Sequence, residues 1–255
     1  GCFKSPGLDS ELARFLEFCG VGPIRHPDFC DTFDSFSSLS QSQAALIIRP
    51  EGKAAGEHLA TEFQMPVLPS FVAFDGETIL ARYRNIASFL KSGKEQGVNN
   101  YFALIMKQAE EITRKARAAI GDATIALDST ATCAPFSLAL ALVKGGLNVT
   151  RIYTTQLPEF EKPAFAELSR LKGDITVANP NHAKKYGSRP LPPLADVSLG
   201  FEAAYATASP VTVPLAFDEG RYGFEGYVMV LEELLKAMDT RNTLQDQVKA
   251  YGLVV

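Results

Sequence analysis

Short apolar runs that alternate with amphipathic segments constrain the fold of this chain more than any other feature of its 255 residues. The first run, 44–48, contains no polar residue, which is typical of a strand buried on both faces of a sheet. We expect a helix after Pro50, a strand over 67–74, and a helix over 79–90, where apolar residues recur at helical spacing. Strands that alternate with helices in this way form parallel sheets through right-handed crossovers.

The same alternation returns in the second half of the chain. A polar segment, 92–97, interrupts the first series, and the segment 101–119 that follows has apolar residues on one side and charges on the other, as expected of a long helix. The second series has expected strands at 124–127, 148–153, 175–178, 197–200 and 211–215, and a terminal helix at 224–238. We therefore predict an α/β protein with two Rossmann-like, doubly wound parallel-sheet lobes joined by a long helix, with helices at the C-terminus. The predicted divisions are 1–95 for the first lobe, 96–121 for the linking helix, and 122–255 for the second lobe with the C-terminal helices.

Composition and charge exclude several classes of protein. Hydrophobic residues make up 46% and charged residues 21% of the chain, which is typical of a globular protein and not of a disordered one. The net charge of −4 offers no basic surface for a phosphate backbone, so we expect no nucleic-acid partner. No apolar run approaches the ~18–20 residues that span a bilayer, and the first residues do not resemble a signal peptide. We expect a soluble, cytoplasmic protein without a membrane partner.

The cysteines and histidines lack the spacing of a metal site. Cys2, Cys19 and Cys30 lie in the first 30 residues and Cys133 stands alone, without a CxxC pair. Reduced cytosolic thiols are the simplest interpretation, while a disulfide or a shared cluster among the first three stays open. No two histidines have ligand-like spacing either, and we predict no metal site in this chain.

Candidate site residues follow from the predicted topology, because open parallel sheets bind ligands beyond the carboxyl ends of their strands. We expect residues at or near these strand ends to approach a common cleft and to bind a ligand or cofactor. Arg49 would provide a fixed cation for a carboxylate or another anion. The candidate binding residues are Arg49, Ser129, Thr132, Cys133, Asn181, His182 and Arg221.

The loop 128–135 is rich in hydroxyl groups and leads directly into a predicted helix. The N–H groups at the start of that helix could bind an anion and lower the pKa of Cys133, or the hydroxyl groups could simply cap the helix. The loop contains no GxGxxG sequence and no GKS or GKT, so neither a dinucleotide fingerprint nor a P-loop is present. His182 could serve as an acid or base, or be an ordinary surface histidine.

The segment 218–227 is the most distinctive part of the sequence, with three glycines and three aromatic residues at a strand-to-helix junction. With the helix that follows, it resembles the nitrogenase component 1 superfamily, which includes molybdenum–iron protein subunits, cofactor-assembly scaffolds, and protochlorophyllide and chlorophyllide reductases. Segments 44–69, 122–153 and 195–201 are similar to further strands and loops of that family. The resemblance covers most of the chain and implies the second and third domains of such a subunit, without the N-terminal domain that supplies cysteines for a bridging iron–sulfur cluster.

The resemblance also implies where a metallocofactor would be anchored. In the molybdenum–iron α subunit, a cysteine after the apolar strand ligates the cofactor, and the matching residue here is Arg49. A histidine ligand in the strand before the glycine-rich turn is matched by Val213 or a neighbour. Neither residue type can ligate iron. We therefore expect no nitrogen reduction and no cofactor held by this chain, while an iron–sulfur cluster or metallocofactor would belong to a full complex.

For function, the resemblance implies a nitrogenase component 1-like oxidoreductase subunit, or a fragment of one, acting on an organic or metallo-organic substrate. Its partners would be a homologous component 1-like subunit, an ATP-dependent iron–sulfur reductase, and a small-molecule or cofactor ligand. Two alternatives stay open: a noncatalytic scaffold or binding protein for a metallocofactor or tetrapyrrole, and a metal-chelate receptor of similar bilobal outline. These alternatives leave open whether the chain is an enzyme.

Overall fold

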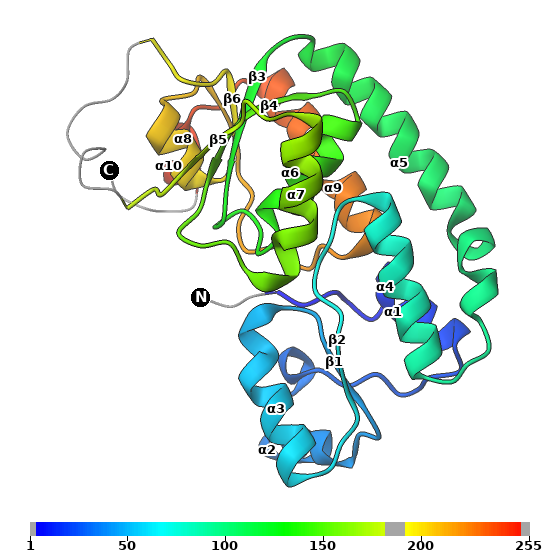
Figure 1. The fold of residues 1–255 in the computed structure, drawn as a ribbon. Helices are drawn as coiled ribbons and strands as arrows, with labels where there is room; N and C mark the ends of the chain where they lie inside the picture. The colour runs from blue at the N-terminus through cyan, green and yellow to red at the C-terminus, as the bar shows by residue number, and fades with distance from the viewer. Residues whose placement is uncertain (1–3, 182–191, 251–255) are drawn as a thin grey trace.

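Two parallel sheets organise the computed structural model, which describes residues 4–181 and 192–250 (Figure 1). The smaller sheet consists of β1 (Ala45–Ile47) and β2 (Val67–Pro69). The larger sheet has five strands, which are, in spatial order, β5 (Thr176–Ala178), β4 (Asn148–Tyr153), β3 (Thr124–Asp128), β6 (Val197–Leu199) and β7 (Val211–Val213). The α/β class and the parallel pairing predicted from the alternating pattern are confirmed.

The strand order of the larger sheet determines where a ligand would be expected. The chain enters the larger sheet at its central strand β3, adds β4 and β5 on one side, and then crosses over to β6 and β7 on the other side. The direction of winding therefore reverses between β3 and β6, which pair directly. In open α/β sheets the crevice beyond the carboxyl ends at such a reversal is the usual ligand site.

Helices cover both faces of the larger sheet. In Figure 1, α8 and α10 lie on one side, and α6, α7 and α9 lie on the other. The long α5 corresponds to the predicted linking helix and packs along α9. The α-helices are α1 (Glu11–Phe18), α2 (Phe33–Ser37), α3 (Lys53–Glu62), α4 (Gly76–Phe89), α5 (Val98–Ile120), α6 (Pro135–Lys144), α7 (Lys162–Leu171), α8 (Phe201–Thr207), α9 (Gly223–Thr240) and α10 (Leu244–Ala250). Short 3-10 turns are η1 (Pro27–Phe29), η2 (Ser38–Gln41), η3 (Pro50–Gly52), η4 (Glu95–Gly97) and η5 (Glu159–Glu161).

The prediction of two doubly wound lobes is confirmed only in part. Among the described residues, the sheet that precedes α5 has two strands, which is too few for helices to wind around both of its faces. The strand expected over 67–74 ends at Pro69, where its partner β1 ends at Ile47. The N–H groups of Ser70 and Val72 still donate to the carbonyls of Ile47 and Ile48, at 2.8 and 3.0 Å, and the residues that follow pack across the molecule. The Phe74 N–H donates to the Ser137 hydroxyl at 3.0 Å, and the ring of Phe71 lies 4.8 Å from that of Phe160.

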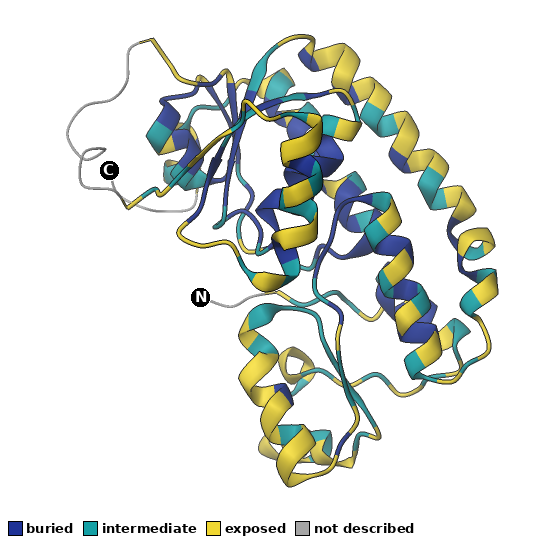
Figure 2. Ribbon diagram, viewed as in Figure 1, coloured by how far each residue is buried: buried dark blue, intermediate teal, exposed yellow. Residues whose placement is uncertain are grey.

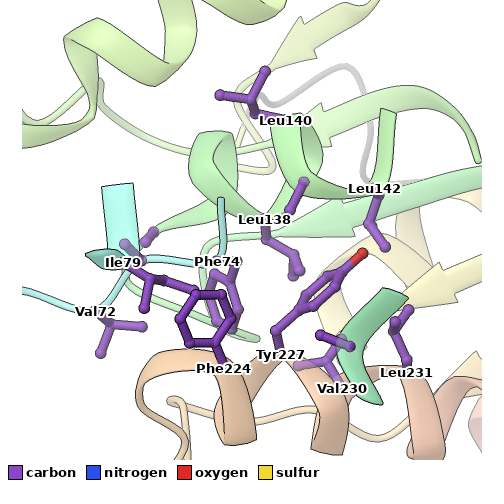
Figure 3. Packing of buried hydrophobic residues seen from close by; sticks show 14 of the residues in the cluster. Val72, Phe74, Ile79, Leu138, Leu140, Leu142, Phe224, Tyr227, Val230 and Leu231 are labelled. Atoms are coloured by element: carbon purple, nitrogen blue, oxygen red, sulfur yellow. The ribbon is translucent and has the colours of Figure 1, made fainter. Parts of the chain in front are cut away.

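One hydrophobic core runs through most of the molecule. It includes Phe15 of α1 and Tyr83 of α4 as well as buried residues of the larger sheet and its helices. Figure 2 shows this continuous buried interior, and Figure 3 shows Ile79 and Phe74 beside Phe224 of α9. The core crosses the division expected at residue 95, and the domain boundaries stay predictions. Within the described ranges, no helix is long and apolar enough to cross a membrane.

Candidate functional site

The loop after β7 has an unusual backbone conformation. Phe217, Asp218 and Glu219 have φ angles of 46°, 62° and 36°, in the left-handed region that residues with side chains avoid. The loop that connects β3 to α6 holds this turn in place, since the Phe217 N–H donates to the Thr130 carbonyl at 2.6 Å and the Asp218 N–H donates to the Ala131 carbonyl at 3.1 Å. Backbone strain of this kind is concentrated at functional sites, which makes the loop a candidate.

The strained loop places the Asp218 carboxylate in a cluster with Arg49 and Cys133. Asp218 is only 3% exposed. Its Oδ2 accepts the Cys133 N–H at 3.1 Å and lies 3.5 Å from Nη1 of Arg49. The Arg49 guanidinium also donates to the Phe217 carbonyl and lies 3.3 Å from the carboxylate of Glu51. An ion pair therefore joins the end of β1 to the loop after β7.

The Cys133 thiol stays protonated in this surrounding. Burial and the neighbouring Asp218 carboxylate raise the pKa of Cys133 well above its ordinary value, and the positive charge of Arg49 offsets only part of this shift. Burial also raises the pKa of Asp218, against hydrogen bonds from Thr132 and Cys133. The pKa of Cys133 is thus shifted in the direction opposite to the lowering that the start of a helix was expected to give.

The N-terminus of α6, where the sequence suggests an anion, is filled by the carboxylate of Glu161. Glu161 Oε2 accepts the Phe136 N–H at 2.6 Å and the Ser137 N–H at 3.3 Å. Its side chain is buried, and burial raises its pKa to about 7 despite these hydrogen bonds. The chain itself thus supplies the negative group that a helix N-terminus favours.

Asp128 occupies the crevice between β3 and β6 in the same manner. Its Oδ1 accepts the N–H groups of Thr130 and Ala131 at 2.8 and 2.9 Å, and its Oδ2 accepts the Ala203 N–H at 2.7 Å. Gly200 has φ 100°, and a Cβ there would lie 2.3 Å from Asp128 Oδ2. A buried carboxylate therefore fills the place where a doubly wound fold would receive the phosphate of a nucleotide.

A third carboxylate, that of Glu11, fills the N-terminus of α9. It accepts the N–H groups of Phe224 and Glu225 at 3.0 and 2.9 Å and the Tyr83 hydroxyl at 2.6 Å. In return, Glu225 Oε2 accepts the Glu11 N–H at 2.8 Å, so α1 and α9 cap each other. Burial raises the pKa of Glu11 to about 7. The starts of α6, α8 and α9 are thus occupied by the chain's own acids.

The predicted site residues fall into two groups. Arg49, Thr132 and Cys133 come together around Asp218, and Arg221 is close by, with Nη1 at 3.3 Å from the Asp218 carbonyl oxygen. Two others do not join this cluster. The Ser129 N–H donates to the Tyr153 carbonyl and so continues the pairing of β3 with β4. Asn181 follows β5, which β4 separates from β3. His182 lies outside the described residues.

The residues at the cluster do not fit a cofactor held by a thiolate and an imidazole. At the two positions that the resemblance assigns to ligands, this chain has an arginine in an ion pair, Arg49, and a fully buried aliphatic residue, Val213. Across 4–181 and 192–250, no group of three or more His, Cys, Asp or Glu side chains could hold a metal ion. A hollow lined by Phe71, Arg82 and Tyr222 has no room even for a water molecule, so it is not a ligand pocket.

Comparison with solved structures identifies the fold. A structure described as nitrogenase Cp1 at pH 6.5 has a TM-score of 0.58 and 14% sequence identity, over 90% of this chain and 56% of that chain. The chain thus spans little more than half the length of that relative. A siderophore periplasmic binding protein from the fuscachelin gene cluster of Thermobifida fusca has a TM-score of 0.33 and 11% identity, over 89% of this chain and 93% of that one. No protein-family model and no curated protein matches the sequence. The resemblance to nitrogenase component 1 is confirmed for the fold, over little more than half of the nitrogenase chain.

Proposed function

We propose that the chain is part of a noncatalytic subunit of a nitrogenase component 1-like complex. The fold supports the assignment to such a complex, because most of the chain superposes on about half of a nitrogenase subunit. The chemistry of the cluster supports the noncatalytic role. In this role the chain contributes a rigid α/β body that binds partner subunits, and it holds no redox cofactor of its own.

The ion pair between Arg49 and Asp218 carries this proposal. Arg49 stands at the end of β1, where the resemblance implies a thiolate ligand, and its guanidinium has no lone pair to donate to a metal. The guanidinium lies 3.5 Å from the Asp218 carboxylate, which also accepts the Cys133 N–H. A positive side chain that is hydrogen-bonded on two sides both repels a metal ion and fills the space a ligand would need.

The partners follow from this assignment. A homologous component 1-like subunit would hold any iron–sulfur cluster or metallocofactor. An ATP-dependent iron–sulfur reductase would deliver electrons to that subunit, and oxidoreductase activity would then belong to the assembled complex. A small-molecule or cofactor ligand would bind to the partner or between the two subunits.

One observation favours a second candidate, an oxidoreductase subunit that acts directly on an organic substrate. Three residues with side chains adopt the left-handed conformation and hold a buried carboxylate, Asp218, against a thiol. Such strain and such a perturbed carboxyl group are frequent at catalytic sites. The partial exposure of Cys133 would allow a substrate to reach this position.

Metal analysis tests whether this chain can hold a redox cofactor, which the noncatalytic role excludes. The chain is purified without oxygen, incubated with iron and sulfide, desalted, and analysed for iron and for absorption between 300 and 600 nm, with Cys133→Ser as the matched control. We expect less than stoichiometric iron and the same spectrum for both proteins. Stoichiometric iron, with an absorption band that is lost in the Cys133→Ser protein, would contradict the noncatalytic role and favour the second candidate.

A binding experiment tests the assignment to a complex. The chain is mixed with a homologous component 1-like subunit, and the molar mass of the mixture is measured by light scattering after gel filtration. We expect a stable complex of the two chains. Two separate peaks at micromolar concentrations would contradict the proposed role.

A further inference from the structure

The segment 25–45 is ordered but contributes nothing to the hydrophobic core. It forms η1, α2 and η2, none of which contains a buried residue. Partly buried residues that pack against the core lie on either side of it, with Ile24 before and Leu46 after. The fold therefore does not depend on the side chains of this segment, and another reason for their identity is needed.

Local hydrogen bonds hold the segment in shape. Thr32 and Ser35 form a capping box at the start of α2, in which each side chain accepts the other's backbone N–H at 3.1 Å. Further upstream, the Asp28 carboxylate accepts the Ser5 N–H at 3.0 Å and the Ser5 hydroxyl at 2.7 Å. The chain thus fixes the conformation of this segment without burying its apolar side chains.

The side chains presented there alternate between phenylalanine and aspartate. Phe29, Phe33 and Phe36 are 38%, 81% and 53% exposed, although phenylalanine is among the residues most often buried. Asp28, Asp31 and Asp34 are exposed between them. We call these six residues the acidic aromatic surface. No lysine or arginine occurs from residue 27 to residue 48. The His26 ring lies beside the surface, with Nδ1 3.7 Å from Asp28 Oδ2 and its centroid 5.6 Å from that of Phe29, and burial lowers the pKa of His26.

We propose that the acidic aromatic surface binds a protein partner that presents a basic amphipathic helix. Lysine or arginine side chains of the partner would pair with the aspartates and lie over the phenyl rings, while apolar residues of the helix cover the rest of the rings. This inference is independent of the proposed function, because it uses no residue of the Arg49–Asp218 cluster and needs no component 1-like partner.

The sign of the charge decides among the classes of partner. Three carboxylates repel phosphate groups, which argues against nucleic acid and against anionic lipid headgroups. They also repel the same surface on a second copy of the chain, whose net charge is −4. Exposed aromatic rings next to carboxylates match the composition of a basic, partly apolar helix.

Two synthetic peptides serve as probes: a helical peptide of leucine and lysine, and the same peptide with glutamate in place of lysine. Binding to the full chain is measured by fluorescence anisotropy of the labelled peptide. One variant carries Phe33→Ser and Phe36→Ser, and another carries Asp31→Lys and Asp34→Lys. The matched controls lie on α5 and remove equivalent groups, Leu104→Ser from a side chain that is 72% exposed and Glu110→Lys from an exposed carboxylate.

We expect the leucine–lysine peptide to bind and the leucine–glutamate peptide not to bind. Each double variant should weaken the binding at least about tenfold, the effect of losing one or two central contacts, and the α5 controls should change it less than about twofold. Melting temperatures should stay the same, since the replaced residues lie outside the core. Absence of binding, or equal weakening by the α5 controls, would overturn the proposal. So would self-association of the wild-type chain that Phe33→Ser and Phe36→Ser abolish, which would identify a second copy as the occupant.

Discussion

Replacing Glu11 with glutamine tests the electrostatics of the contact between α1 and α9. The Glu11 carboxylate is buried, and it accepts hydrogen bonds from the Tyr83 hydroxyl and from the N–H groups of Phe224 and Glu225. Desolvation outweighs these bonds and raises the pKa of Glu11 from 4.5 to about 7. Between these two values the folded protein keeps a proton on Glu11 that the unfolded chain has released.

A pKa that is raised in the folded state makes the protein less stable as the pH rises. The contribution of Glu11 is fully present below pH 4.5, is lost as the pH rises toward 7, and is absent above that value. Within this window a single group changes the free energy of unfolding by about 1.4 kcal/mol per pH unit. Between about pH 5 and pH 8 the loss amounts to about 2.5 kcal/mol. Glutamine does not titrate, so the advantage of the wild type over Glu11→Gln should fall by that amount.

Urea denaturation of both proteins at several pH values between 5 and 8 measures this difference. The Tyr83→Phe variant provides a second comparison, since it removes a hydrogen bond that lowers the pKa of Glu11. In that variant the loss of stability should extend to a higher pH. A wild-type minus Glu11→Gln difference that stays constant over the whole range would refute the reasoning, because it would mean that Glu11 does not change its charge in the folded protein.

Two further predictions concern the loops at the carboxyl edge of the larger sheet. The raised pKa of Cys133 predicts that iodoacetamide alkylates this thiol slowly near pH 8, as measured by mass spectrometry. Asp218→Asn should accelerate the alkylation, because it removes the adjacent negative charge. An unchanged alkylation rate in Asp218→Asn would contradict the role given to that charge. Gly200→Ala should destabilise the protein by at least about 2 kcal/mol in thermal denaturation, because its φ is 100° and its Cβ would meet the Asp128 carboxylate. Gly76→Ala is the control, because the nearest atom to a new Cβ at Gly76, in the first turn of α4, is 3.6 Å away. This substitution should leave the stability unchanged or raise it. Equal losses of stability at the two glycines would contradict the role given to Gly200.

The sequence predicts the strands and the longer helices well, because their signals are local. A wholly apolar run such as 44–48 marks a strand, and a helix as long as α5 repeats its apolar face several times. The expectation that this strand is buried on both faces is wrong, since all three residues of β1 are only half-buried in a sheet of two strands. Short helices carry a weaker signal. The seven-residue α8 completes about two turns, and it begins at a left-handed glycine that a strand end could equally contain. The apolar residues after Pro69 resemble a strand because the central hydrophobic core buries Val72 and Phe74, while only the Ser70 and Val72 N–H groups still pair with the β1 segment.

The cluster around Asp218 could be predicted only in part. The topology rule places Arg49 and Cys133 after the carboxyl ends of strands, but these strands belong to different sheets, and only the folded chain brings the two residues together. The Asp218 carboxylate, which contacts both residues, is placed by three consecutive residues with positive φ. No sequence signal marks such a conformation when the residues are not glycine. No sequence pattern marks Glu11 and Glu161 as caps of distant helices either. Each resembles an ordinary surface acid in the sequence, and only the fold brings it to a helix start elsewhere in the chain.

The mutual capping of α1 and α9 has a consequence for synthesis on the ribosome. Glu11 and Glu225 are separated by 214 positions, so the start of α1 gains its contact with Glu225 only after nearly the whole of this chain has been synthesised. At the usual ~5–20 residues per second, that interval is on the order of 10–40 s. During it, α1 can pack its Phe15 against Tyr83 of α4 and Phe102 of α5, but the Glu11 carboxylate lacks the N–H groups of Phe224 and Glu225. The contact between α1 and α9 is therefore among the last that this chain can complete during synthesis.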